Sequence, residues 1–173
     1  MLIESFLDYL RLERNYSERT IVSYRTDLRE FGGFLENTEA ELDWKKVHAD
    51  HVRNWMVSLM EGGKAATSVN RKLSSLRSFY RFLLRKKLVA VNPMLKVVGP
   101  KKKKPLPFFV REKDMDRLLD EIPFKEGFEG CRDRTILEMF YATGMRLSEL
   151  IGLNDADVDF ASKLIKVTGK RNK

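Results

Sequence analysis

Residues 142–150 have the sequence Ala-Thr-Gly-Met-Arg-Leu-Ser-Glu-Leu. Gly144 interrupts an apolar helical pattern, and a glycine at such a point is typical of a helix end. Arg146 then stands at the beginning of a second helix. A guanidinium donates two parallel hydrogen bonds and keeps its charge, so it is suited to grip a phosphate. By spacing alone, an arginine after a glycine is more often a surface or ion-paired residue, and that alternative stays open.

The second helix is expected to hold Arg146 between rigid neighbours. Leu147, Leu150 and Ile151 recur on one side of it and are predicted to be its packed side. Glu149 lies one helical turn after Arg146, on the same side. It either orients the arginine or is a solvent-facing acid.

As a string, residues 142–150 closely resemble the first active-site box of the tyrosine recombinases, the phage-integrase family. The Xer recombinases, which resolve chromosome dimers, are the most similar branch. A second match lies downstream, where an apparent strand over 163–168 leads into Gly-Lys-Arg-Asn-Lys. This resembles the family's hairpin whose turn carries the active-site lysine, and the resemblance implies that role for Lys170. Arg171 and Lys173 are lesser candidates for it.

The layout of the whole chain is similar to that family as well. The sequence predicts a helical domain over 1–98, a linker rich in proline and lysine over 99–107, and a second domain over 108–173. The resemblance implies a mainly α fold: a SAM-like four-helix DNA-binding domain, followed by the first part of an α+β tyrosine-recombinase catalytic domain. In the family the two domains close around duplex DNA.

Apolar residues recur at helical spacing in the first domain and again in the second. The four sets in the first domain are Ile3, Phe6, Leu7 and Leu10; Ile21, Tyr24, Leu28, Phe31 and Leu35; Val52, Trp55, Met56 and Leu59; and Leu73, Leu76, Tyr80 and Leu83. Ser17 is a plausible N-cap for the second helix. The fourth helix is expected over 67–87, and Asn92-Pro93 is expected to stop it. Two further sets, around Met115 and around Leu137, predict helices of the second domain.

Charge is concentrated in one part of the chain. The formal net charge is +8 and the isoelectric point about 9.6. Residues 62–104 contain 13 Lys or Arg and no Asp or Glu, so the other residues, with 20 basic and 25 acidic side chains, sum to −5. A block of one sign is an interaction surface more often than a solvated face. The block therefore predicts a polyanionic partner, namely double-stranded DNA.

The candidate DNA contacts lie on the fourth helix, at its beginning and in the linker. On that helix Arg77, Arg81 and Arg85 recur every four residues, and this basic stripe has no acidic partner at helical spacing. Hydroxyls at a helix start suit phosphate contacts. The candidates are Lys64, Thr67, Ser68, Asn70, Arg71, Lys72, Arg77, Arg81, Lys101, Lys102, Lys103 and Lys104.

Other functional classes find little support in the composition. One cysteine allows no intrachain disulfide, and with two histidines it makes no convincing zinc site, so we expect no metal and no cofactor. No signal peptide or membrane span is apparent, which predicts a cytoplasmic, nucleoid-associated protein. A DNA-binding protein with a vestigial catalytic box remains an alternative. So does a helical protein whose basic face meets acidic protein or lipid.

The family's chemistry needs residues beyond the two boxes. A tyrosine attacks a DNA phosphate to form a 3′-phosphotyrosyl link, arginines stabilise the charged transition state, and lysine protonates the leaving 5′-oxygen. The His-x-x-Arg box and the tyrosine should follow the lysine hairpin. All five tyrosines lie upstream of Lys170, and His48 and His51 lie in the helical domain. We therefore expect an N-terminal fragment that binds DNA without cutting it, from a parent that recombines DNA as a tetramer of protomers.

Overall fold

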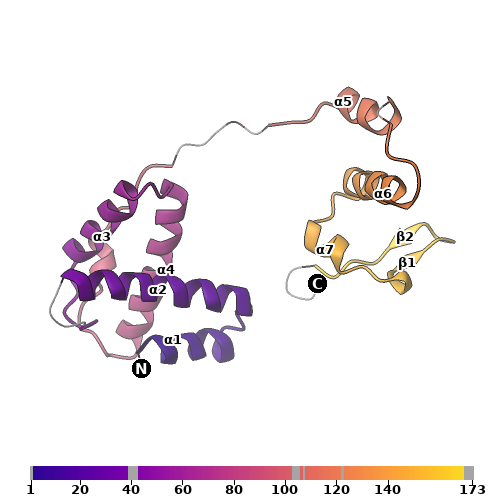
Figure 1. Ribbon diagram of the computed structural model, residues 1–173. Helices are drawn as coiled ribbons and strands as arrows, with labels where there is room; N and C mark the ends of the chain where they lie inside the picture. Colours follow the sequence, from indigo (N-terminus) through magenta and orange to yellow (C-terminus); the bar gives the residue numbers. More distant parts are fainter. Residues whose placement is uncertain (1, 39–42, 103–105, 107, 122, 170–173) are drawn as a thin grey trace. The chain divides into compact units, whose positions relative to one another are not determined.

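A computed structural model describes residues 2–38, 43–102, 106, 108–121 and 123–169. The chain divides into two compact units, Met1–Pro105 and Leu106–Lys173 (Figure 1). We call them unit 1 and unit 2.

Unit 1 consists of helices joined by short loops. In chain order they are α1 (Leu2–Asp8), the π-helical turn η1 (Tyr9–Glu13), α2 (Glu18–Thr38), α3 (Ala49–Glu61), α4 (Ala66–Arg85) and the 3-10 turn η2 (Pro93–Lys96). The four predicted helices are confirmed. The fold is mainly α, as the sequence predicted.

Local interactions explain most of the boundaries. The Ser17 hydroxyl accepts the backbone N–H of Thr20 at 3.4 Å, so Ser17 begins α2. The end of α4 was predicted wrongly. The helix stops at Arg85, and Lys87 has φ +57°, a left-handed conformation that breaks the helical ladder. Asn92 therefore does not end α4; its side chain accepts the N–H of Met94 at 2.9 Å and begins η2.

The core of unit 1 is aromatic and aliphatic. Its fully buried side chains include Phe6 on α1, Phe31 on α2 and Leu73 on α4, with Trp55 of α3 only 2% exposed. The Phe31 and Trp55 rings lie 5.0 Å apart between centroids. All four apolar sets predicted from periodicity contribute to this core. The sequence did not single out the core residues that come from loops and turns, which are Trp44, Val47, Val89, Met94 and Val97.

Unit 2 contains short helices and one small hairpin. They are α5 (Glu112–Asp116), the π-helical turn η3 (Arg117–Glu121), α6 (Phe128–Thr143), α7 (Leu147–Ile151), the 3-10 turn η4 (Asp155–Asp157), β1 (Val158–Asp159) and β2 (Leu164–Ile165). The strands pair antiparallel, with Val158 opposite Ile165. The strand predicted over 163–168 is thus shorter than expected.

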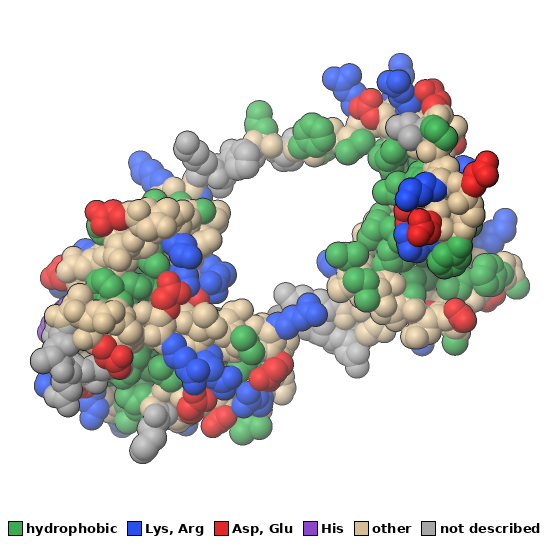
Figure 2. All heavy atoms as spheres, viewed as in Figure 1, with side chains coloured by type: hydrophobic (Ala, Val, Ile, Leu, Met, Phe, Trp, Pro, Cys, Tyr) green, Lys and Arg blue, Asp and Glu red, His purple; other side chains and the backbone are tan. Residues whose placement is uncertain are grey.

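The apolar side chains of unit 2 are not gathered into a core. Among its described residues only Gly130 and Glu149 are buried, and hydrophobic side chains cover much of the visible face of this unit (Figure 2). The predicted packed side of the helix after Arg146 is therefore wrong for two of its three residues. Leu147 is 63% and Ile151 74% exposed, whereas Leu150 is half-buried.

Candidate nucleic-acid interface and arginine box

Arg146 lies at the junction between α6 and α7. Gly144 ends α6 with φ +64°, a left-handed conformation that side-chain-bearing residues rarely adopt, and its N–H donates to the oxygen of Phe140. Arg146 itself is extended (φ −82°, ψ 154°) and is the N-cap residue of α7. The glycine and arginine thus have the junction positions that the sequence predicts.

Glu149 holds Arg146 at two points. One carboxylate oxygen accepts the backbone N–H of Arg146 at 2.8 Å, and the other accepts Nη1 of its guanidinium at 2.8 Å. The Glu149 side chain is only 8% exposed. These bonds lower the pKa of the Glu149 carboxyl, the backbone bond first and the guanidinium bond second. Glu149 is therefore an ionised partner of Arg146, and the solvent-facing alternative does not describe it.

The guanidinium remains open to a ligand. The Arg146 side chain is 74% exposed, and within the part of the chain that the structure describes only its Nη1 is bonded, to Glu149. The other nitrogens can donate to phosphate oxygens without breaking the contact with Glu149. Lys170, Arg171 and Lys173, the candidates for proton transfer, lie outside the described residues.

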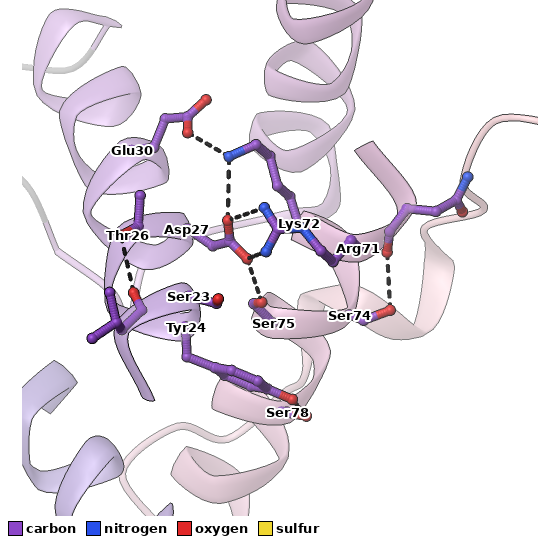
Figure 3. A network of polar contacts seen from close by, with 12 residues as sticks. Ser23, Tyr24, Thr26, Asp27, Glu30, Arg71, Lys72, Ser74, Ser75 and Ser78 are labelled. Atoms are coloured by element: carbon purple, nitrogen blue, oxygen red, sulfur yellow. Dashed lines mark hydrogen bonds and ion pairs between the residues drawn. The ribbon is translucent and has the colours of Figure 1, made fainter. Parts of the chain in front are cut away.

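A buried ion network joins α2 to α4 (Figure 3). Asp27 of α2 is fully buried, and Arg71 donates to both of its oxygens at 2.6 and 2.8 Å. Lys72 reaches Asp27 at 3.2 Å and Glu30 at 2.5 Å. The Ser75 hydroxyl donates to Asp27 at 2.6 Å. Two acids and two bases thus neutralise each other inside unit 1.

This network gives two of the candidate DNA contacts a different role. The side chain of Lys72 is only 8% exposed, so Lys72 has a structural role. Its prediction as a DNA contact is corrected. Arg71 remains 52% exposed, although its charge is balanced by Asp27. No local pattern indicates this pairing, because Asp27 lies 44 residues from Arg71.

Two other candidates on α4 contact the backbone. Asn70 donates to the oxygens of Ala66 and Pro100, at 2.7 and 2.8 Å. Arg77, half-buried, donates from Nη2 to the oxygen of Val97 at 3.1 Å. Each therefore has structural bonds within unit 1, which the basic stripe did not predict.

The remaining candidates are accessible. Arg81 is exposed, and its Nε donates to the oxygen of Arg77. Lys64, Thr67 and Ser68 precede or begin α4, and their side chains bond to no described residue. The further candidates are Lys101 and Lys102, which are exposed, and Lys103 and Lys104, which lie outside the described residues.

A pocket beside Arg71 was not predicted from the sequence. It has a volume of about 310 Å³ and lies between α2 and α4; its lining includes Arg19, Thr20, Ser23, Arg71 and Ser74. Arginines and hydroxyls together are phosphate-binding chemistry. The pattern that could have indicated this pocket is Arg19 and Ser23, four residues apart on one side of a predicted helix. Both residues lie outside the basic block on which the candidate contacts were based.

The comparisons with known proteins agree with this fold. Residues 3–87 match the model of the phage integrase N-terminal SAM-like domain, and residues 109–173 match that of the phage integrase family. The chain therefore belongs to the phage integrase family of tyrosine recombinases.

Within the family, the chain is similar to tyrosine recombinases named XerC. It is 42% identical to the XerC of Staphylococcus carnosus, an alignment that covers 98% of this chain and 56% of the relative. It is 42% identical to that of Pediococcus pentosaceus over 99% of this chain and 57% of the relative. The chain thus spans about half the length of the curated relatives that it matches.

Solved structures of integrases share the fold. The Tn1549 transposon integrase in complex with circular intermediate DNA has a TM-score of 0.72 and 16% identity, covering 96% of this chain and 53% of that one. A lambda integrase dimer bound to a core site has a TM-score of 0.68 and 15% identity, covering 98% of this chain and 55% of that one.

Proposed function

We propose that this chain is the DNA-binding part, with the first section of the catalytic domain, of a site-specific recombinase. The whole protein would cut and rejoin duplex DNA through a 3′-phosphotyrosyl intermediate, as a tetramer of protomers on paired sites. The observation that carries the proposal is the Arg146–Glu149 pair, an exposed guanidinium that a buried carboxylate holds in place. The pair lies in a chain that is similar to a XerC recombinase over 98% of the chain's length.

In this proposal Arg146 binds the non-bridging oxygens of the phosphate under attack. Negative charge builds up on these oxygens in the transition state, and an arginine fixed beforehand stabilises it without a reorganisation cost. Glu149 is a positioning residue. Lys170 gives its proton to the leaving 5′-oxygen, a role that suits a tunable ammonium group. The reaction needs no metal and no nucleotide.

DNA binding falls mainly to unit 1. The accessible cations Lys64, Arg81, Lys101 and Lys102 supply phosphate contacts, and Arg71 adds the exposed part of its guanidinium. Thr67 and Ser68 offer hydroxyls at the start of α4. We place the protein with the nucleoid in the cytoplasm. No helix among the described residues has the length and apolar character needed to cross a bilayer.

Cleavage by the full-length protein tests these roles. A nicked duplex that traps the covalent intermediate reports cleavage, and filter binding reports affinity. We expect Arg146→Ala to abolish most cleavage while leaving affinity nearly unchanged, because the arginine acts on charge that develops in the transition state. A large loss of affinity together with unchanged cleavage at saturating protein would contradict the proposal.

The lysine is tested by changing the leaving group. Lys170→Ala should slow cleavage strongly on ordinary DNA. A 5′-phosphorothiolate should restore the rate, because sulfur leaves without a proton. Equal slowing on both substrates would remove Lys170 from the role of general acid and point to Lys173 or Arg171.

A further inference from the structure

Three side chains of unit 1 donate hydrogen bonds to backbone oxygens of the segment 96–100. Arg53 of α3 donates to the oxygen of residue 96 at 2.9 Å. Arg77 and Asn70, both on α4, donate to the oxygens of residues 97 and 100 at 3.1 and 2.8 Å. The three residues before the predicted linker, and the first two residues of that linker, are therefore attached to two helices.

Gly99 fits this arrangement because it has no side chain. A Cβ atom at this position would lie 2.2 Å from Oδ1 of Asn70 and 3.2 Å from Cδ1 of Leu73. Leu73 is fully buried, and the Asn70 amide is held by its bonds to the oxygens of Ala66 and Pro100. A side chain at Gly99 must therefore displace the amide that holds the segment.

A side chain inserted into the core adds a further anchor. The side chain of Val97, whose own backbone oxygen accepts the bond from Arg77, is only 5% exposed. Its N–H donates to the oxygen of Met94, which belongs to η2 and is 4% exposed. The segment is thus held by one buried side chain as well as by three polar bonds.

We propose that Arg53, Asn70, Arg77 and Gly99 form a linker clasp, which fixes the point, beside the second turn of α4, where the basic linker leaves unit 1. The clasp places Lys101 and Lys102 at the beginning of that helix, beside Lys64, Thr67 and Ser68, so that one duplex meets all of them together. This positioning role rests on the proposed DNA binding; the clasp itself does not.

The physical basis is the loss of freedom before binding. Pro100 is bonded to Asn70, in the second turn of α4, and consecutive Cα atoms are about 3.8 Å apart. Lys101 therefore begins next to that turn. A lysine run already held there loses less conformational freedom when it meets phosphates than a freely moving run does. Arg77 has no ion pair among the described residues, so its guanidinium holds the linker and keeps its charge for DNA.

The test uses Gly99→Ala, which alters the clasp without removing any proposed DNA contact. Gly33→Ala is the matched control, because a Cβ at Gly33 meets nothing within 4 Å. Arg53→Lys is a second clasp variant that keeps the charge but loses the planar fork, which bonds both Asp50 and the backbone oxygen of residue 96. Urea unfolding checks that all variants are folded.

Hydrogen exchange measured without DNA tests the clasp. The backbone amide of Val97, whose N–H is bonded to the oxygen of Met94, should exchange at least several-fold faster in Gly99→Ala and Arg53→Lys than in wild type or Gly33→Ala. Unchanged exchange in both clasp variants would overturn the clasp.

Binding to a duplex tests the positioning role. We expect both clasp variants to bind several-fold more weakly, with a smaller slope of log affinity against log salt, because two positioned lysines contribute less. Faster exchange with unchanged affinity would overturn the positioning role. If wild type itself binds no DNA, the proposed function and the positioning role both fail, and the exchange data still decide whether the clasp exists.

Discussion

The Glu149 carboxylate joins the backbone and the side chain of Arg146, accepting the N–H and Nη1 of the same residue at 2.8 Å each. A single buried acid therefore begins α7 and aims the guanidinium. The helix start and the candidate phosphate clamp depend on the same ionised group, so a change at Glu149 affects both.

The pair predicts a pH dependence. The pKa of Glu149 is lowered in the folded chain by its bonds to Arg146. A lowered pKa means that the contact stabilises the fold above the ordinary pKa of glutamate, about 4.3, and that the stabilisation is lost as pH falls through the lowered value. Carbon-13 NMR of the Glu149 carboxyl should therefore show a titration midpoint below the ordinary glutamate value. A midpoint at the ordinary value would show that the pair does not form in solution.

The ion network between α2 and α4 predicts a strong effect on stability. Asp27→Ala leaves Lys72 buried with Glu30 as its only carboxylate partner among the described residues, and it leaves Ser75 without its acceptor. Breaking a buried pair from one side costs about 3–5 kcal/mol. Urea unfolding should show a loss of that order. Glu30→Ala, at a side chain 38% exposed, should cost about 1 kcal/mol or less. Equal costs would show that Asp27 is not the centre of the network.

Two cations of α4 should differ in DNA binding. Arg81 is exposed, whereas the Lys72 side chain is 8% exposed and paired. Arg81→Gln should reduce the slope of log affinity against log salt by about one unit, because one phosphate contact is lost. Lys72→Met should leave that slope unchanged. A reversed order would show that α4 presents another face to the duplex.

The tyrosines of this chain should not attack DNA. Tyr80 is fully buried, burial raises its pKa, and its hydroxyl donates to the oxygen of Trp44. The Tyr9 hydroxyl accepts a bond from Arg85 at 2.8 Å. A nicked suicide substrate should therefore give no covalent adduct with this chain, as seen by denaturing electrophoresis. An adduct mapped by peptide sequencing to any of its five tyrosines would overturn the assignment of roles.

Local patterns predicted the parts of the fold that depend on local interactions. Apolar periodicity placed the helices of unit 1 and inward-facing residues such as Leu73 and Tyr80, because burying one helix face leaves a period of about 3.6 in the sequence. The junction at Gly144 and Arg146 was also predictable, because helix ends have residue preferences of their own.

Contacts between distant residues could not be predicted in this way. The acidic partners of Arg71 and Lys72 come from α2, more than 40 residues earlier, so these two members of the basic block looked unpaired. The bonds from Arg77 to Val97 and from Asn70 to Pro100 join positions 20 and 30 residues apart. The exposure of Leu147 depends on what packs against α7, which its own sequence does not specify.

Binding of this chain to duplex DNA, followed by fluorescence anisotropy across a salt series, tests the central claim most directly. The account predicts binding at low salt, with affinity falling by an order of magnitude or more towards moderate ionic strength, because several phosphate contacts release counterions. Absence of binding at low salt, or an affinity indifferent to salt, would contradict it.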